Sequence, residues 1–590
     1  MANIDVPVVI VGGGGAGLTA SMLLSGLGVD SLLVSALPTT SVLPKAHLLN
    51  QRTMEILGDA GVADAIYAVG TPRANMAKTA FYAGFTGWTD AGRCLGQLDA
   101  WGGGGTDLEW ESASPRWCAN LPQIRLEPLM KQRAEELAPG RVRFGHEVVS
   151  LDHDDDGVRI TVRVRDSGEE YSVRSKFLIA CDGGRFVGPR LGVEYEGLRD
   201  AGSMISIHMT ADFSPWARDP DVLIRWTWLP HMSKMATLVP MGPTRWGPTS
   251  EEWVFHLNYS NDDPRRLDGA LVEADMREAL GIGDCDVTIH MITRWELMGV
   301  VASSFRVGNV FFAGDAAHRH PPTGGLGLTS ATQDVHNLCW KLAYVLAGDA
   351  RPGLLDSYES ERRSSIHANV DNSLTSALNH IVIGDTLGLV DPEQTAEAGW
   401  AKVAKVWGDD PADEEYRERV RLAIASQTQE FRKLNVEYGY RYSSGAILPD
   451  GTPEPVSPDP TRVYRPSTRP GSPLPHAWVT TRGGERISTL DAVRPGRFVL
   501  IAGSDGAAWV DAAREIASAS QFPLDAYTLG HLAGDLLDLE CSWLRHREFA
   551  EDGAILVRPD RFIAWRSLSS SSSPQEDLRD ALASILATTL

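Results

Sequence analysis

The stretch VVIVGGGGAG at residues 8–17 decides the fold of this chain. Val8–Val11 is a continuous β-branched run, typical of a buried strand, and a helical stretch rich in Leu and Ala follows the glycines. Between them Gly12, Gly14 and Gly17 have the spacing G-x-G-x-x-G. In this context Gly12 forms the tight turn, Gly14 admits a pyrophosphate and Gly17 packs the helix on the strand. The stretch therefore predicts an α/β, Rossmann-like domain that binds a dinucleotide.

The next strand, Ser31–Ser35, departs from this fingerprint. An acidic residue should end it and hold a ribose hydroxyl, but Ser35 stands there. A serine hydroxyl bonds the ribose more weakly than a carboxylate does. Lys45 and Arg52 are candidates to help bind the adenosine end, and solvated surface cations are the alternative interpretation of both.

A second strand end lies at Gly314–Leu342, GDAAHRHPPTGGLGLTSATQDVHNLCWKL. The apolar run Val307–Ala313 predicts a buried strand that delivers Asp315, and apolar residues from Ala331 onward recur at helical spacing. Prolines and glycines between them admit a close backbone approach, and a helix N-terminus attracts a partly negative ligand. The pattern favours a flat ligand such as a flavin. His318 and His320 lack further ligands in sequence and are interpreted as local packing, not as a metal site.

Two more segments extend the site. Lys176–Ala180 predicts a buried strand that ends in Cys181-Asp182-Gly183-Gly184-Arg185, where open α/β sheets bind ligands. A helix is expected from near Pro122, with Gln123 exposed at its start. His47 precedes another helix and, alone, is more often structural than catalytic.

Residues 193–293 have a different texture, with strand-like segments rich in Trp, Met and His. They predict a mostly antiparallel sheet with one face over a pocket. Trp226, Trp228, Met235 and Trp253 are candidates to line an apolar aromatic-binding cavity. Ordinary sheet core is the alternative for each of them.

The composition and net charge of the chain disfavour several classes of partner. The chain has 590 residues and a formal charge of −22, which disfavours nucleic acid and anionic lipid. No apolar run approaches the roughly 20 residues of a membrane helix, and no secretion signal is evident. Six cysteines without CxxC pairing are typical of reduced thiols in a cytoplasmic protein.

The C-terminal part reads as a separate unit. Residues 449–475 carry too many prolines for a regular element. The tail has a β-α-β-β-α order that resembles thioredoxin, but Cys541 is its only cysteine, so dithiol exchange is excluded. The predicted domains are FAD-binding (1–75, 120–190 and 294–375), substrate-binding (76–119 and 191–293), a helical segment (376–448), a linker (449–476) and a thioredoxin-like domain (477–590).

Together these motifs resemble the single-component FAD-dependent aromatic hydroxylases, which include p-hydroxybenzoate hydroxylase, and most closely the phenol and 2,4-dichlorophenol hydroxylase branch. The motifs that carry the resemblance are GGGGAG, PKAHLLNQRTMEIL, LPQIRLEPLM, IACDGGR, GDAAHRHPP with the following GLG, and, in the tail, PHAW and DGAILVRPDRFIAWR.

The resemblance implies a tightly but non-covalently bound FAD and a transient NADPH or NADH. The expected cofactor-binding residues are Gly12, Gly14, Gly15, Ala16, Gly17, Ser35, Lys45, Arg52, Gln123, Asp182, Gly314, Asp315, Pro322, Gly325, Gly327, Leu328 and Thr329. The expected substrate pocket comprises His47, Trp226, Trp228, Met235, Trp253 and Pro321. Thr329 stands where the family usually has asparagine, and tolerance is expected because the flavin contact there is mainly through the backbone.

The implied chemistry is hydroxylation of a phenolic or hydroxypyridine-like ring. NADPH reduces the flavin, O₂ adds at its C4a carbon, and the terminal hydroperoxide oxygen passes to the ring. His47 is the expected phenol-facing base, since the dichlorophenol-type branch has histidine where phenol hydroxylases have an acid. Both a catabolic and a natural-product tailoring role are compatible with the motifs, and family members are usually dimers or larger, so a homo-oligomer is expected.

Two alternatives stay open at this point. Trp226-Thr227-Trp228-Leu229-Pro230 nearly matches the W-x-W-x-I-P motif of flavin-dependent halogenases but is one residue short. A non-catalytic flavoprotein is the other alternative, and the intact Asp315, Gln123 and Asp182 disfavour it.

Overall fold

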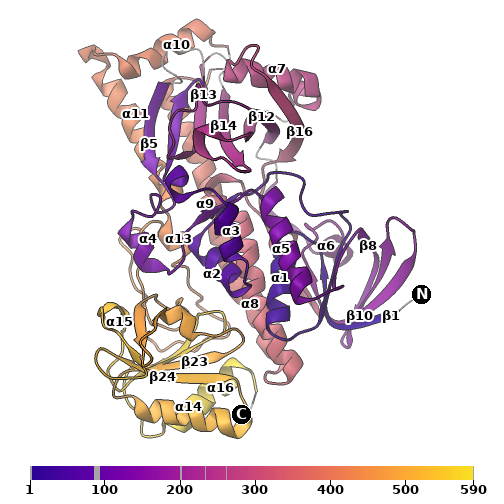
Figure 1. The fold of residues 1–590 in the computed structure, drawn as a ribbon, viewed down its shortest axis with the longest axis vertical. Helices are drawn as coiled ribbons and strands as arrows, with labels where there is room; N and C mark the ends of the chain where they lie inside the picture. Colours follow the sequence, from indigo (N-terminus) through magenta and orange to yellow (C-terminus); the bar gives the residue numbers. More distant parts are fainter. Residues whose placement is uncertain are drawn as a thin grey trace.

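The computed structural model describes residues 3–85, 93–199, 202–230, 232, 234–260, 262–391 and 393–588. Figure 1 shows three bodies along the long axis of the molecule. A central domain contains the N-terminal strand, a sheet with helix α7 (Gly269–Leu280) lies at one end, and the C-terminal domain lies at the other.

The central sheet has eight strands and a parallel core, as predicted. Its path is β18 (Arg306–Val307), β19 (Val310–Phe312), β10 (Glu170–Ala180), β1 (Asn3–Val11), β2 (Ser31–Ser35) and β7 (Val142–Phe144), with β9 (Gly157–Val164) on β10 and β8 (His146–Asp154) on β9. The pairs from β19 to β7 are all parallel. Val8, Val9 and Ile10 are fully buried, as the continuous apolar run of a strand covered on both faces requires.

The strand predicted over residues 307–313 is interrupted. Arg306–Val307 and Val310–Phe312 form an antiparallel hairpin instead of one continuous strand. Gly308 turns the chain with a φ of 59°, and the Asn309 side chain donates to the carbonyl of Asp154, 3.1 Å away. The short β19 ends at Phe312, and only Ala313 separates it from Gly314, so a strand still leads into the turn that carries Asp315.

The second sheet has seven strands and is mostly antiparallel, as predicted. Their order is β16 (Val287–Glu296), β12 (Ser203–Ala211), β15 (Glu252–Tyr259), β14 (Lys234–Gly242), β13 (Val222–Leu229), β4 (Lys78–Ala83) and β5 (Arg93–Asp99). Only β13 and β4 pair in parallel. One face packs on α7 through the core around Trp253 and Phe255, and the other faces the central domain. Strands β4 and β5 are separated in the sequence from strands β12 to β16 by segments of the central domain, yet all of them form this one sheet.

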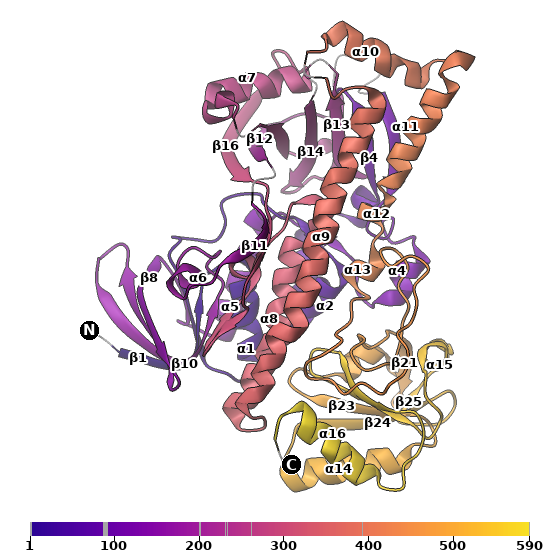
Figure 2. The same cartoon turned by 180° about the vertical axis from the view of Figure 1, so that it is seen from behind.

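Two long helices connect the domains. Helix α8 (Gly327–Ala347) packs on α1 (Gly15–Gly26), and α9 (Asp356–Leu387) runs from the central domain up to the second sheet, as Figure 2 shows. The predicted boundary between residues 375 and 376 falls inside α9, because a single 32-residue helix serves both domains. Helices α10 (Ala396–Ala404) and α11 (Glu414–Ser426) follow beside the sheet.

The C-terminal domain is an α/β unit around a seven-stranded sheet. Its strands, in spatial order, are β22 (Arg486–Ser488), β21 (Trp478–Thr481), β25 (Leu536–Leu537), β24 (Leu524–Gly530), β23 (Phe498–Ala502), β26 (Ala554–Val557) and β27 (Ile563–Ser567). Helices α14 (Ala507–Ser520) and α16 (Pro574–Ile585) pack together beside the sheet. Residues 449–476, all described, contain no helix or strand.

Buried charges join this domain to the rest of the chain. Arg558 donates to both carboxylate oxygens of Glu361 on α9, at 2.7 and 2.8 Å, and neither side chain is exposed. Separating such a pair leaves an uncompensated buried charge, so this ion pair holds the C-terminal domain against α9. None of the helices in the described part of the chain has the length and apolar composition that a membrane-crossing segment needs.

Candidate functional site

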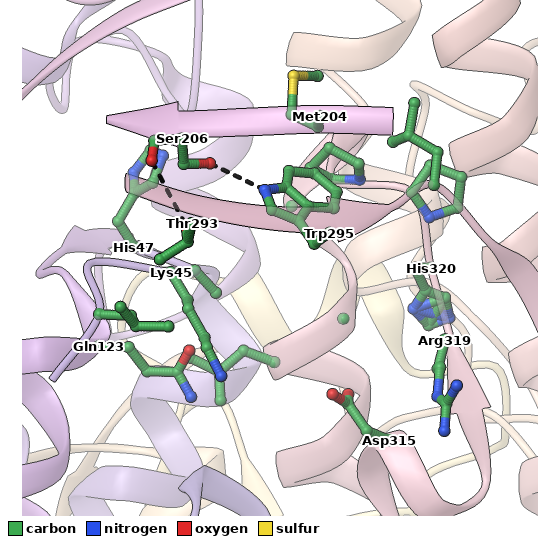
Figure 3. A pocket seen from close by; sticks show the side chains of 18 of the residues that line it. Lys45, His47, Gln123, Met204, Ser206, Thr293, Trp295, Asp315, Arg319 and His320 are labelled. Atoms are coloured by element: carbon green, nitrogen blue, oxygen red, sulfur yellow. Dashed lines mark hydrogen bonds between the residues drawn. The ribbon is translucent and has the colours of Figure 1, made fainter. Parts of the chain in front are cut away.

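A cavity of about 1860 Å³ lies between the central domain, the second sheet and α9. Pockets for a single small ligand are usually below about 1,000 Å³, so this space can take a cofactor together with a substrate. Figure 3 shows side chains converging on it from both domains, with Lys45, Gln123 and Asp315 at one end and Ser206, Thr293 and Trp295 at the other.

The loop between β1 and α1 forms a cradle that suits a pyrophosphate. Gly12 has a φ of 116°, and a Cβ atom there would lie 2.1 Å from the carbonyl oxygen of Cys181. A Cβ on Gly17 would lie 1.9 Å from the carbonyl oxygen of Gly12, so helix and loop touch through backbone. At Gly14 a Cβ would meet only Glu127, 3.7 Å away, and would fill the open cavity. The cradle fits the dinucleotide that the sequence predicts.

Glu127 is a cavity residue that the sequence analysis missed. It lies one turn after Gln123 on α5 (Gln123–Leu137), and its carboxylate accepts from Gln123 Nε2 at 2.6 Å and from the Ser41 backbone N–H at 2.7 Å. Burial raises its pKa. The i,i+4 spacing of Gln123 and Glu127 in LPQIRLEPLM was the available signal. Together the two residues fix the segment that carries Lys45 and His47 beside the cavity.

Buried charges behind the cavity hold the turn that carries Asp315. Asp334 on α8 accepts from the Gly314 backbone N–H at 3.1 Å, from His318 Nε2 at 2.7 Å and from Arg362 Nε at 2.9 Å. Burial raises the pKa of Asp334, but the charges of His318 and Arg362 outweigh it and lower that pKa. His318 is therefore local structure, as predicted.

His320 differs from His318. Its ring stacks on His318 with centroids 4.8 Å apart and lines the cavity, and neither ring nitrogen has a hydrogen-bond partner. Burial and then the neighbouring His318 lower its pKa to about 3, so the ring is neutral. The expected local packing is present as the stack on His318, but the ring of His320 also borders the cavity.

Asp182 lines the cavity but turns its carboxylate toward its own loop. It accepts from the backbone N–H groups of Gly184, Phe186 and Val187 at 2.8–3.1 Å. Its carboxylate thus shapes the loop after β10. Beside it, Arg319 Nη2 donates to the carbonyl of Gly183 at 2.7 Å and lines the cavity, a contact that no motif indicated.

Most of the predicted site residues meet around this one cavity. Those that line it are Gly12, Gly14, Gly15, Ala16, Ser35, Lys45, His47, Gln123, Asp182, Trp226, Trp228, Met235, Gly314, Asp315, Pro321, Pro322, Gly325, Gly327 and Leu328.

Four predicted residues lie behind its wall. Gly17 serves the contact between helix and loop, and Thr329 is buried in the first turn of α8, where its hydroxyl donates to the Leu326 carbonyl at 3.0 Å. Arg52 is buried in α2 (Gln51–Asp59), pairs with Glu55 at 2.7 Å and stacks on Tyr438, so it does not line the cavity. Trp253 is fully buried on the α7 side of the second sheet.

Strand parity explains the wrong assignment of Trp253. Successive side chains of a strand point to opposite faces. On β15 the even-numbered His256 and Asn258 line the cavity, while Trp253 and Phe255 pack on the α7 side. The Trp253 indole donates to the carbonyls of Ala211 and Ser250 at 3.2 and 3.0 Å, which completes its burial.

Polar side chains gather at the end of the cavity next to the second sheet. His47 Nδ1 lies 2.5 Å from Asn120 Oδ1, and Asn120 Nδ2 donates to Thr71 Oγ1 at 2.7 Å. This arrangement gives His47 a proton on Nδ1 and a lone pair on Nε2. Burial lowers the pKa of His47, and the bond to Asn120 opposes this only partly. His47 is thus a neutral ring able to accept a proton.

His256 is a second cavity histidine, and sequence reasoning missed it. Its Nδ1 lies 2.8 Å from Ser206 Oγ. Trp295 Nε1 donates to the same Ser206 Oγ at 2.8 Å (Figure 3). Burial and then His47 lower the pKa of His256 to about 3. The only sequence signal was its place in a strand rich in aromatic residues.

Two family models match this chain. The FAD binding domain model matches residues 5–373, and the model for the C-terminal region of aromatic-ring hydroxylases matches residues 467–589.

Curated relatives match over nearly the whole chain. A 2,4-dichlorophenol 6-monooxygenase from Delftia acidovorans is 35% identical over 99% of this chain and 98% of its own length. A tetracenomycin A2 monooxygenase-dioxygenase from Streptomyces glaucescens is 32% identical over 100% and 98%.

A solved structure shares the whole architecture. It is the flavin-dependent monooxygenase PieE in complex with FAD and substrate, with a TM-score of 0.92, 38% identity and complete coverage of both chains. These matches favour a hydroxylase over the halogenase and non-catalytic alternatives. The cavity, its dinucleotide cradle and these matches agree: the chain belongs to the FAD-dependent aromatic-ring hydroxylases, in the branch of the phenol and 2,4-dichlorophenol monooxygenases.

Proposed function

We propose that this enzyme hydroxylates a phenolic or hydroxypyridine-like ring that is part of an apolar body larger than phenol. The observation that carries this proposal is the substrate end of the cavity, where neutral histidines face a broad apolar wall. The wall consists of Ile224, Trp226, Trp228, Met204, Met235, Leu374, Leu378, Ile381 and Leu389. A simple phenol would leave most of this surface uncovered.

His47 is the proposed base. Its Nε2 lone pair accepts the proton of the substrate hydroxyl, and the resulting phenolate is a better nucleophile than the phenol. Asn120 keeps the Nδ1 proton in place and so holds the ring in the tautomer that this step needs.

His256 is the proposed second contact to the substrate oxygen. If Ser206 donates its hydroxyl proton to Nδ1, then Nε2 of His256 carries a proton and is a donor. A donor beside the base stabilises negative charge on the oxygen as His47 removes the proton. Trp295 supports this orientation because its indole N–H occupies a lone pair of Ser206 Oγ.

For the cofactor we propose contacts from the cavity residues of the predicted set. Gly12 and Gly14 would hold the pyrophosphate, Lys45 and Gln123 the middle of FAD, Asp315 the ribityl chain, and the backbone from Gly325 to Leu328 the isoalloxazine edge. The chemistry that bound FAD would supply is the uptake of electrons from NADPH or NADH and the activation of O₂. The buried part of the apolar wall, formed by Ile224, Trp226 and Trp228, would keep water from the reacting ring and so limit side reactions.

A substrate panel tests the proposal. The holoenzyme is supplied with NADPH and, in turn, phenol, 2,4-dichlorophenol and tetracenomycin A2, and NADPH oxidation and product mass are followed with and without chloride or bromide. We expect the multi-ring compound to stimulate NADPH oxidation most and to gain the mass of oxygen, without dependence on halide. If a simple phenol is the better substrate by kcat/KM, the size argument fails. If no compound stimulates NADPH oxidation, the hydroxylation proposal fails.

Assembly as a homo-oligomer and a cytoplasmic location, both expected from the sequence, stay predictions. Sedimentation of the purified holoenzyme measures the first.

A further inference from the structure

Two buried charged side chains outside the FAD-binding motifs hold the backbone of one residue of the cavity wall, Gly324. They come from α12 (Thr428–Phe431) and from the residue before α13 (Leu434–Glu437). Glu430 Oε1 accepts from the Gly324 backbone N–H at 2.8 Å. Lys433 Nζ donates to the Gly324 carbonyl at 2.5 Å. Both side chains are at least 96% buried.

Gly324 lies in the turn that we expect to face the flavin. Gly324 and Gly325 have φ values of 80° and 63°, so the turn joins two glycines in the left-handed region. Consecutive glycines have more backbone freedom than any other pair, and a turn built from them needs outside restraint to stay in one conformation. Holding the N–H and the C=O of Gly324 restrains the two peptide planes on either side of this residue.

Glu430 and Lys433, together called the clamp, carry charges that are not needed merely to cover the turn. Burying a carboxylate and an ammonium group is unfavourable, and apolar side chains would cover the turn at lower free energy. Directional bonds from charged groups instead set the orientation of a peptide.

The clamp also reaches the substrate wall. The second oxygen of Glu430 pairs with His380 Nε2 on α9 at 2.7 Å. The His380 ring stacks on Trp226, with centroids 4.0 Å apart and planes at 27°. One continuous set of contacts therefore runs from Trp226 through His380 and Glu430 to the Gly324 peptide.

We propose that Glu430 and Lys433 are positioning residues, which fix the Gly324 turn against the flavin and tie it, through His380, to the aromatic wall of the substrate pocket. The proposal rests on the proposed placement of the flavin beside Gly325 and does not depend on which substrate is hydroxylated.

The test compares three variants with a matched control. E430A and K433M each remove one arm of the clamp, and E430Q keeps an oxygen that can accept from the Gly324 N–H. Lys341 supplies the control because it is fully buried and pairs with Glu361 at 2.8 Å, and it does not line the cavity. FAD dissociation constants of the reconstituted apoproteins, the visible circular dichroism of bound flavin and the thermal midpoint are measured for each.

We expect E430A and K433M to weaken FAD binding about tenfold and to change the flavin dichroism, since each loses a hydrogen bond to a charged group. E430Q should stay within about threefold of the wild type, because a neutral amide oxygen replaces the carboxylate. K341M should lower the thermal midpoint but leave the FAD constant unchanged. Equal FAD constants and dichroism in E430A, K433M and the wild type would overturn the proposal, whatever the thermal midpoints.

G324A provides a second approach if E430A or K433M does not fold. A Cβ on Gly324 would lie 2.4 Å from Lys433 Nζ and would displace this flexible amine, and it would also strain the turn, because alanine rarely adopts the φ of 80° found there. G324A should therefore weaken FAD binding at least as much as K433M does, and an unchanged FAD constant would contradict the clamp. Because the readouts concern FAD, they stand even if no phenol in the substrate panel is hydroxylated.

Discussion

The two ends of the cavity differ in what lines them: mostly backbone at one end and mostly side chains at the other. The proposed cofactor end consists mostly of backbone, with glycine turns at the ends of parallel strands and a helix N-terminus around Gly12, Gly314 and Gly327. The proposed substrate end consists of side chains from alternate positions of a sheet and from α9. Backbone sites depend on glycines at fixed spacings and tolerate few changes, whereas side-chain sites can be altered one residue at a time.

The largest effect is expected at the backbone cradle. Gly12→Ala places a methyl group 2.1 Å from the Cys181 carbonyl, at a φ that alanine rarely adopts. We expect FAD affinity to fall by at least about 100-fold, because a strained loop of this kind costs several kcal/mol. FAD content after gel filtration and the dissociation constant measure this.

Gly26→Ala is the matched control for Gly12→Ala. Apart from the backbone of its own helix, no atom lies within 4 Å of a Cβ on Gly26, the last residue of α1. It should retain FAD and gain about 0.5–1 kcal/mol of stability. If Gly12→Ala retains FAD as Gly26→Ala does, the cofactor end is not limited by its backbone.

At the substrate end, His47→Ala should lower kcat/KM by about 10²–10⁴, the range for loss of a general base, with FAD affinity unchanged. A neutral ring is required, so activity should be full above the His47 pKa and be lost as the pH falls through it. Because burial lowers this pKa below its usual 6.5, the acid limb should lie below pH 6.5.

Asn120→Asp tests the assignment of that limb. A carboxylate beside Nδ1 stabilises the imidazolium and raises the pKa of His47, so the limb should move to higher pH by about one unit or more. A pH profile that does not move would mean that another group controls the limb.

Alanine variants of Trp226 and Trp253 test which face of the second sheet each side chain points to. Trp253→Ala should cost about 3–5 kcal/mol of unfolding free energy, because the residue is fully buried on the α7 side, with KM unchanged. Trp226→Ala should raise KM for the best substrate of the panel about tenfold and cost less stability, since its ring borders the cavity. Denaturant unfolding and steady-state kinetics separate the two, and a large KM change in Trp253→Ala would contradict the parity argument.

The smallest effect is expected for Thr329→Asn, which restores the residue usual in the family. The Thr329 side chain is buried behind the cavity wall and bonded to the Leu326 carbonyl, so it does not line the cavity. FAD affinity should stay within about threefold, the size of one weak hydrogen bond. A larger change would show that this side chain reaches the cofactor.

The order of helices and strands and the cofactor end could largely be predicted, because local rules govern both. Buried parallel strands appear as apolar runs, and a close backbone approach appears as glycine, so Gly12 and Gly14 were identified correctly as cavity residues. Arg52 was assigned wrongly because its charge suggested a ligand, whereas Glu55 and Tyr438 hold it inside the protein.

The substrate end could be predicted only in outline. A segment rich in Trp, Met and His indicates a sheet beside a pocket, but its composition is the same whichever face is turned inward. Trp226 and Trp253 therefore looked equivalent, and His256 had no distinguishing signal. The register of seven strands and the position of α7 decide which side chains meet the cavity.

By itself, the sequence determined the Rossmann-like core, the dinucleotide cradle and the C-terminal α/β domain, because short-range patterns of apolar residues and glycine specify strands, turns and helix starts. Only the tertiary structure brought His47, Asn120 and His256 together, turned Trp253 away and laid Glu430 and Lys433 against Gly324. The hydrogen bonds of His47 and of Gly324 join residues 73 to 109 positions apart in the chain. Such pairs are set by the packing of domains and helices, which local sequence patterns do not specify.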